Sequence, residues 1–232
     1  MDEPLLKTGQ ILVFEGDSLT RRHLAPSGDT WPFARIMGLD RSYSELVDEW
    51  LFVNLPHLRL KSVHAAFGGS SIESITHRYA AHVKTVQPNW IVLTVGGNDQ
   101  RRGVTLDAFA DSLARYIDTA QRDSGARFLF AGGLLPMPGI SDDAREKMLK
   151  AQPYYEVARR VIHQSGGLAP MIGTAMLRQA ETLFELSSYH TMYADGTHLN
   201  ALGNRVLASL VLQALGAYKL LYPLENPLHA SV

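Results

Sequence analysis

Residues 14–20 read FEGDSLT, and this stretch decides the fold because an apolar strand ends inside it. Residues 11–14 are all apolar, whereas Gly16, Asp17 and Ser18 are typical of turns and are disfavoured in strands. The pattern predicts a strand over residues 10–14 that stops abruptly before a loop. Either these three residues form an ordinary strand-to-helix turn, or they place a reactive side chain at the end of the strand.

Apolar runs of strand length alternate with longer segments of helical period in the rest of the chain. Further strands are predicted over residues 58–66, 89–96, 126–133 and 167–174, and helices over residues 43–54, 72–86, 105–123, 142–164, 175–186 and 200–216. This alternation indicates a parallel sheet with helices on both faces. We expect a three-layer α/β/α architecture with a five-stranded parallel sheet, in a single domain over residues 1–232.

Glycine-rich and polar residues follow the first three predicted strands. GDS at residues 16–18 follows the first strand, GGSS at residues 68–71 the second, and GGND at residues 96–99 the third. In parallel α/β sheets, ligands bind beyond the carboxyl ends of the strands, where the connecting loops gather. The three loops are therefore expected to face one crevice.

The composition argues against several classes of function. The chain has 22 Lys and Arg against 23 Asp and Glu, scattered along its length, so no nucleic-acid partner is expected. It has no cysteine, which excludes disulfides and thiolate chemistry and fits a reducing compartment. Its histidines lack zinc-binding spacing, and no metal or organic cofactor is expected. With no signal peptide and no apolar run of about 18 residues, we expect a cytoplasmic protein without a membrane span.

Each of the other two loops admits a structural and a chemical interpretation. GGND is a generic loop with a capping Asn, or it carries an amide at Asn98 that donates to an oxyanion. GGSS is a turn before a helix, or it exposes the backbone N–H of Gly69 to a ligand, since no Cβ intervenes. No GxxxxGK[ST] or GxGxxG motif is present, so a nucleotide site is not expected.

The stretch YADGTHLNALG, residues 193–203, brings a carboxylate and an imidazole together. The three-residue spacing of Asp195 and His198 is common by chance, but the pair lies just before an apolar helical segment. A carboxylate there would fix the tautomer of the ring and stabilise its charged form. Because histidine has an ordinary pKa of about 6.5, His198 is suited to accept the proton of Ser18 near neutral pH.

Four blocks of the sequence resemble those of the GDSL, or SGNH, hydrolase family of esterases and lipases. GDSL at residues 16–19, AAFGGSS at residues 65–71, GGND at residues 96–99 and DGTHLN at residues 195–200 occur in the family's order. The resemblance implies the flavodoxin-like SGNH hydrolase fold. It also implies that Ser18 is the nucleophile of a triad with Asp195 and His198.

The resemblance further implies how the oxyanion is held. The donors would be the backbone N–H of Ser18, the backbone N–H of Gly69 and the side-chain amide of Asn98, with Asp17 and Gly96 in supporting positions. The second block departs from the family pattern, because His64 and Ala66 stand where the family usually has Asn and Gly. Gly68 is therefore the alternative donor. Thr20 occupies the position of the second glycine of the G-x-S-x-G motif, so a sharp nucleophile elbow is not expected.

The resemblance implies a serine esterase that works through an acyl-enzyme. The layout of the blocks is similar to that of bacterial enzymes that remove acetyl groups from carbohydrates such as xylan, so the expected substrate is a small-molecule or oligosaccharide ester. A lysophospholipase or thioesterase is the alternative enzyme, with the apolar residues 132–140 as its acyl groove. The alternative from another functional class is a catalytically inactive binding module. The sequence does not decide whether the chain forms a homo-oligomer. Six side chains are candidates for a polar acceptor site: Trp31, Tyr79, Arg101, Arg102, Tyr154 and Tyr193.

Overall fold

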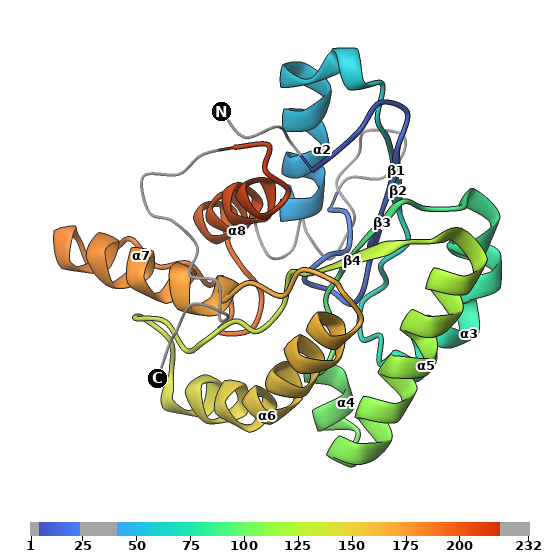
Figure 1. Ribbon diagram of the computed structural model, residues 1–232. Coiled ribbons are helices and arrows are strands. Elements are labelled where there is room, and N and C mark those ends of the chain that lie inside the picture. The colour runs from blue at the N-terminus through green and yellow to red at the C-terminus, as the bar shows by residue number, and fades with distance from the viewer. Residues whose placement is uncertain (1–4, 24–40, 219–232) are drawn as a thin grey trace, which may run out of the picture.

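A parallel sheet with the strand order β2-β1-β3-β4 forms the centre of the molecule (Figure 1). The computed structural model describes residues 5–23 and 41–218. The strands are β1 Ile11–Glu15, β2 Lys61–His64, β3 Trp90–Leu93 and β4 Arg127–Phe130. Every neighbouring pair is parallel, and β1 lies between β2 and β3. The strand order therefore reverses between β1 and β3, which is where open α/β sheets bind their ligands.

The expectation of a fifth strand over residues 167–174 is wrong, because only Leu168 pairs with the sheet. Its N–H donates to the carbonyl of Phe128 at 2.7 Å, and its carbonyl accepts from the N–H of Phe130 at 2.8 Å. Pro170 follows two residues later and has no N–H to continue a ladder. Helix α7 then begins at Ile172, so the pairing ends after one residue and the sheet has four strands.

Helices cover both faces of the sheet, as the alternating pattern predicts. They are α2 Tyr43–Asn54, α3 Ile72–His82, α4 Gly97–Arg101, α5 Leu106–Ser124, α6 Asp142–Gln164, α7 Ile172–Leu186 and α8 Ala201–Ala214. Two short 3₁₀ turns, η1 Pro56–Leu58 and η2 Lys84–Val86, replace the ends predicted for a strand and a helix. Helix α4 was not predicted from the sequence.

Side chains alternate between two cores on opposite faces of the sheet. Leu12 and Phe14 of β1 pack in one core together with α2, α7 and α8. Val13, between them, packs in the other core with α3, α5 and α6. Successive side chains of a strand point to opposite faces, so a strand buried on both faces reads as a continuous apolar run. The three layers of the prediction are therefore present.

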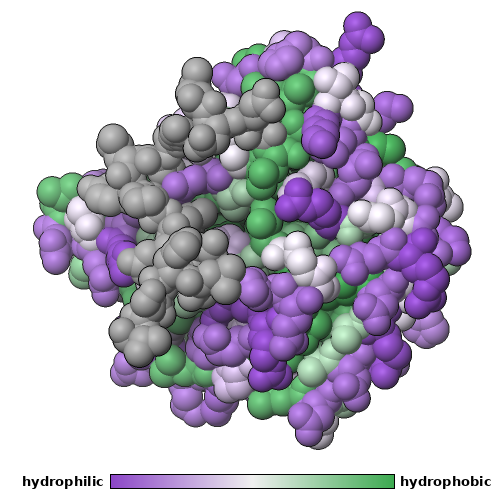
Figure 2. All heavy atoms as spheres, in the orientation of Figure 1, coloured by the Kyte–Doolittle hydropathy of each residue, from purple (hydrophilic) through white to green (hydrophobic). Residues whose placement is uncertain are grey.

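Hydrophilic and apolar residues alternate over the face seen in Figure 2. Among residues 5–23 and 41–218, none of the helices combines the length and the apolar character that crossing a bilayer requires.

Candidate active site

The loop after β1 holds Ser18 at the carboxyl end of the central strand. Gly16 has φ 142°, and a Cβ there would lie 2.3 Å from Oγ1 of Thr94 and 2.5 Å from its carbonyl oxygen. Only glycine lets the loop leave β1 this close to β3. Asp17 then fixes the turn, since its Oδ1 accepts the N–H of Leu19 at 3.0 Å and its carbonyl accepts that of Arg21. The strand therefore stops at Gly16 so that Ser18 can lie over the crevice.

His198 and Asp195 come from a turn that precedes α8. Oδ1 of Asp195 accepts the backbone N–H groups of Thr197 at 2.9 Å and His198 at 2.7 Å. The N–H of Ala194 donates to the carbonyl of His198 at 2.8 Å and closes the turn. Asn200 caps α8 by accepting the N–H of Gly203 at 3.0 Å. The backbone of the turn thus fixes the position of both side chains.

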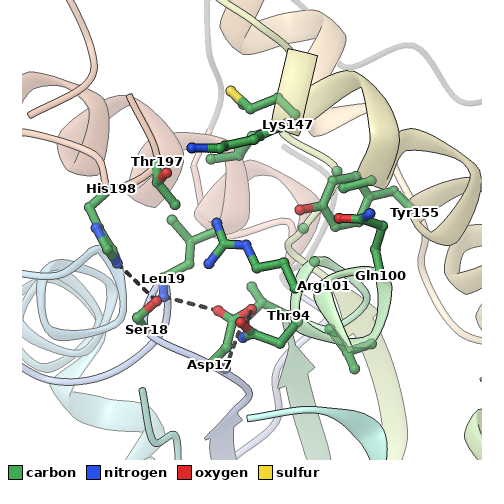
Figure 3. Close-up of a pocket in the computed structure, with 18 residues that line it drawn as sticks. Asp17, Ser18, Leu19, Thr94, Gln100, Arg101, Lys147, Tyr155, Thr197 and His198 are labelled. Atoms are coloured by element: carbon green, nitrogen blue, oxygen red, sulfur yellow. Dashed lines mark hydrogen bonds between the residues drawn. The ribbon is translucent and has the colours of Figure 1, made fainter. Parts of the chain in front are cut away.

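Ser18, His198 and Asp195 form a continuous hydrogen-bonded series. Nε2 of His198 lies 3.0 Å from Oγ of Ser18, and Nδ1 lies 2.7 Å from Oδ2 of Asp195. The contact between Ser18 and His198 is drawn as a dashed line in Figure 3. Burial acts to raise the pKa of Asp195, but the hydrogen bonds from His198 and Thr197 outweigh it and hold that pKa below its ordinary value. Asp195 is therefore an anion at neutral pH, as stabilising an imidazolium requires.

Asn98 reaches the crevice from the first turn of α4. Its Nδ2 donates to the carbonyl of Ser70 at 3.1 Å and lies 3.5 Å from Oδ2 of Asp17. The first contact ties the loop after β3 to the loop after β2. The second is at the limit of a hydrogen bond, so one amide hydrogen is only weakly engaged.

Gly68 lies nearer to the nucleophile than Gly69 does. A Cβ on Gly68 would stand 3.9 Å from Cβ of Ser18, whereas a Cβ on Gly69 would meet no atom within 4 Å. Gly69 has φ 77°, and its carbonyl accepts from Arg102 at 3.0 Å. Within the described part of the chain, neither glycine N–H donates to another backbone group. Both remain available to a ligand, with Gly68 closer to Ser18.

Asp17 and Gly96 stabilise the loops after β1 and β3 through hydrogen bonds. Burial raises the pKa of Asp17, although its hydrogen bonds with Leu19 and Thr94 act in the opposite sense. Gly96 has φ 115° and donates its N–H to Oδ2 of Asp99 at 3.2 Å. The other oxygen of Asp99 accepts the N–H of Ile72 at 3.0 Å, so this buried carboxylate joins the start of α4 to the start of α3.

A pocket of about 70 Å³ opens beside Ser18 and His198. Trp31 lies outside the described residues, and of the five other side chains suggested for an acceptor site only Arg101 lines this pocket. Sequence reasoning missed five further polar lining residues, namely Thr94, Gln100, Lys147, Tyr155 and Thr197. Lys147 and Tyr155 lie on α6. The sequence shows the helical period of this segment, but it does not show which of its side chains face the pocket. Thr197 could have been found from its place beside His198.

The apolar segment 132–140 contributes both to the pocket and to the core. Gly132, Gly133 and Leu134 line the pocket, but Leu134 and Met137 are buried in the core with α7 and α8. No group of three metal-ligating side chains occurs within residues 5–23 and 41–218.

The chain matches a model of the GDSL-like lipase/acylhydrolase family over residues 14–206. In fold it is similar to LAE5, an α/β hydrolase enzyme from the metagenome of Lake Arreo, with a TM-score of 0.73 and 20% identity over 94% of this chain and 100% of that one. It is also similar to Axe2, an acetylxylan esterase from Geobacillus stearothermophilus, with a TM-score of 0.72 and 18% identity over 92% and 97% of the two chains.

Three of the similar Axe2 structures are of catalytic mutants, in which a serine, a histidine or an aspartate is replaced by alanine. At these identities the likeness establishes the fold. No protein with curated annotation matches the chain significantly in sequence.

Proposed function

Because the chain belongs to the GDSL-like lipase/acylhydrolase family, a family of carboxylic ester hydrolases, we propose that it hydrolyses acetyl esters through an acyl-enzyme on Ser18. The observation that carries the proposal is the hydrogen-bonded series from Ser18 through His198 to Asp195. The same three residue types are replaced in the Axe2 catalytic mutants.

In the first half of the reaction, Oγ of Ser18 attacks the ester carbonyl and Nε2 of His198 takes its proton. Asp195 stabilises the imidazolium. The negative charge on the carbonyl oxygen is met by the N–H of Ser18, the amide of Asn98 and a glycine N–H of the second loop. Either Gly69 or Gly68 supplies that glycine donor.

Acylation ends when this first tetrahedral intermediate collapses and the ester C–O bond breaks. His198 returns its proton to the leaving alcohol, and the acyl group stays on Ser18. His198 then takes a proton from water, whose oxygen attacks the acyl carbon. Collapse of this second intermediate releases the carboxylic acid and restores the Ser18 hydroxyl.

The proposed substrate is a small-molecule or oligosaccharide acetyl ester, with carbohydrate as the alcohol part. The pocket volume of about 70 Å³ is well below the ~300 to 1,000 Å³ typical of pockets that enclose drug-sized ligands. A space of this size suits an acetyl group better than a long acyl chain. Similarity in fold to an acetylxylan esterase supports the carbohydrate.

A panel of esters tests the proposal. We expect purified protein to cleave p-nitrophenyl acetate faster than the octanoate, and to release acetate from acetylated xylo-oligosaccharides. Faster cleavage of the octanoate would instead indicate a lysophospholipase or thioesterase.

Covalent labelling separates an active esterase from an inactive binding module. A fluorophosphonate probe should label Ser18, because it reacts with activated serine nucleophiles. Protein that stays unlabelled and releases no product from any ester of the panel would favour the binding module.

A further inference from the structure

Arg101 places a positive charge in the pocket, one helical turn from Asn98. Both residues lie on α4, and side chains three positions apart share one face of a helix. Figure 3 shows Arg101 extending across the pocket between Asp17 and Lys147. A group bound by Arg101 would therefore lie beside the oxyanion site. Because an acetyl group carries no charge, a charged group bound there would belong to the alcohol part of the ester.

The guanidinium of Arg101 makes no ion pair or hydrogen bond with any of the described residues. Arg102, the next residue, contrasts with it, since its guanidinium donates to the carbonyl of Gly69. The side chain of Arg101 is exposed on the pocket side and keeps its donors available. A guanidinium with five fixed donors is the side chain best matched to a carboxylate or phosphate.

The other charged residues that line the pocket are Lys147 and Asp17. Nζ of Lys147 pairs with Oδ2 of Asp143 at 2.6 Å, in an exposed contact that contributes little. Asp17 is the one carboxylate among the described residues that line the pocket, against two cations, and Leu19 and Thr94 already donate hydrogen bonds to it. The balance of charge in the pocket is therefore positive, and such a pocket attracts anions.

Tyr155, on α6, adds a neutral donor to the same pocket. Glycine at position 97 leaves room for it, because a Cβ there would stand 2.8 Å from the tyrosine hydroxyl. Among the described residues no group hydrogen-bonds this hydroxyl, and burial raises its pKa, so it keeps its proton. A guanidinium and a phenol that line one pocket can both donate hydrogen bonds to a bound anion.

We propose that the alcohol part of the substrate carries an anionic group, a carboxylate or a phosphate, which Arg101 binds with Tyr155 as a second donor. This inference rests on the proposed function, because it concerns the substrate of the same site. An acetylated sugar acid and an acetylated sugar phosphate are the two sources of such a group.

Matched esters test the inference on the intact protein. The probes are p-acetoxybenzoate, p-acetoxyphenyl phosphate and the neutral p-acetoxybenzamide, with each rate divided by its rate of hydroxide-catalysed hydrolysis. We expect a higher normalised kcat/KM for one of the anionic esters than for the amide, and a preference that shrinks as salt is added. The better anionic ester identifies the source. A wild-type protein that prefers the amide, or that makes no distinction, overturns the inference.

Variants assign any preference to Arg101. In Arg101→Gln the ratio of anionic to neutral kcat/KM should fall about tenfold or more, the scale of one charge-assisted hydrogen bond, while Arg101→Lys should retain part of it. Arg115→Gln is the matched control, since Arg115 is an exposed arginine of α5 outside the pocket. Equal changes in the ratio for both Gln variants would contradict the inference.

A binding measurement separates failure of this inference from failure of the proposed function. Calorimetry with Ser18→Ala protein, which cannot form an acyl-enzyme, should give tighter binding of the better anionic ester than of p-acetoxybenzamide, and Arg101→Gln should remove the difference. If no ester is hydrolysed but this difference is found, the esterase proposal fails and the anion site stands. If the esters are hydrolysed but bind alike, the anion site fails alone.

Discussion

At the scale of single residues, the reactivity proposed for Ser18 depends on the groups that hold His198 in place. A serine hydroxyl is a weak nucleophile until a base removes its proton. Asp195 uses one oxygen to accept two backbone N–H groups and the other to accept the ring of His198. The same carboxylate thus shapes the turn and orients the imidazole, so the position of its negative charge is fixed in the folded state.

Replacement of Ser18 tests the nucleophile directly. Ser18→Ala should lower kcat for p-nitrophenyl acetate by about 10⁴-fold or more, because the acyl-enzyme cannot form. Unfolding in urea monitored by circular dichroism should give the same midpoint as the wild type. Activity within tenfold of the wild type would show that another group performs the attack.

Asn98 tests the oxyanion site. Asn98→Ala should lower kcat by about 10² to 10³ with a smaller effect on KM, because the amide acts on charge that develops in the transition state. The variant also loses the hydrogen bond to the carbonyl of Ser70, so its stability is measured alongside. A change in KM with unaltered kcat would assign Asn98 to substrate binding instead.

Short motifs in the sequence predicted Ser18, Asn98 and His198 of the candidate site, but they did not predict most of the other side chains that line the pocket. Ser18, Asn98 and His198 each stand in a block whose composition is unusual for a loop. Tyr155 stands in the middle of a long helix, and only the packing of α6 against α4 turns it toward the pocket. Helical periodicity identifies an apolar face, but it does not tell which polar residue borders a cavity.

At the scale of elements, Arg78 of α3 links the loop after β1 to the loop after β2. Its guanidinium and Glu15 of β1 form a buried ion pair. The same side chain donates to the carbonyls of Gly16 and Ala65 and to Oγ of Ser70. One arginine therefore sets the spacing between the loop of the nucleophile and the glycine loop.

Removing Arg78 should destabilise the protein strongly. Arg78→Met should lower the free energy of unfolding at pH 8 by about 3 to 5 kcal/mol, since it leaves Glu15 buried without its cation. Urea unfolding measures the loss, with Arg115→Met on the surface of α5 as the control. The double variant Glu15→Gln/Arg78→Met should recover part of the stability. Equal stability of Arg78→Met and the wild type would contradict this role.

Helix boundaries followed from the sequence where a polar cap is present. Helices α2 and α6 begin and end as predicted, and Ser42 and Ser141 cap their first turns. Helix α4 was missed because its five residues, which include three of the GGND block, are too few to show a period. Residues 167–174 were predicted as a strand from their apolar character. Because Pro170 and the start of α7 follow so closely, only Leu168 pairs with β4.

At the scale of the whole molecule, a titratable carboxylate lies at the centre of the sheet. The side chain of Glu15 is 0% exposed, at the end of the central strand. Burial raises its pKa from 4.5 to about 7, although Arg78 acts in the opposite sense. The folded state therefore binds a proton more tightly than the unfolded state does. The stability that this contributes is present below about pH 4.5 and is lost as the pH rises through about 7.

Glu15→Gln should remove this dependence on pH. From pH 5 to pH 8, the free energy of unfolding of the wild type should fall relative to that of the variant by up to about 3 kcal/mol. Urea unfolding at several pH values measures the difference, with the exposed Glu73→Gln as the control. Parallel curves for wild type and Glu15→Gln, or a difference of opposite sign, would contradict the raised pKa.

The hydrogen bond from Ser18 to His198 joins residues that are 180 positions apart. During synthesis, the nucleophile and both glycine loops leave the ribosome long before the imidazole does. Helix α8 follows His198 and packs on α2, so within residues 5–23 and 41–218 the last helix of the chain closes against the first. A nascent chain thus has a serine without its base, and the onset of ester cleavage would report that translation has passed His198 and that the two ends have joined.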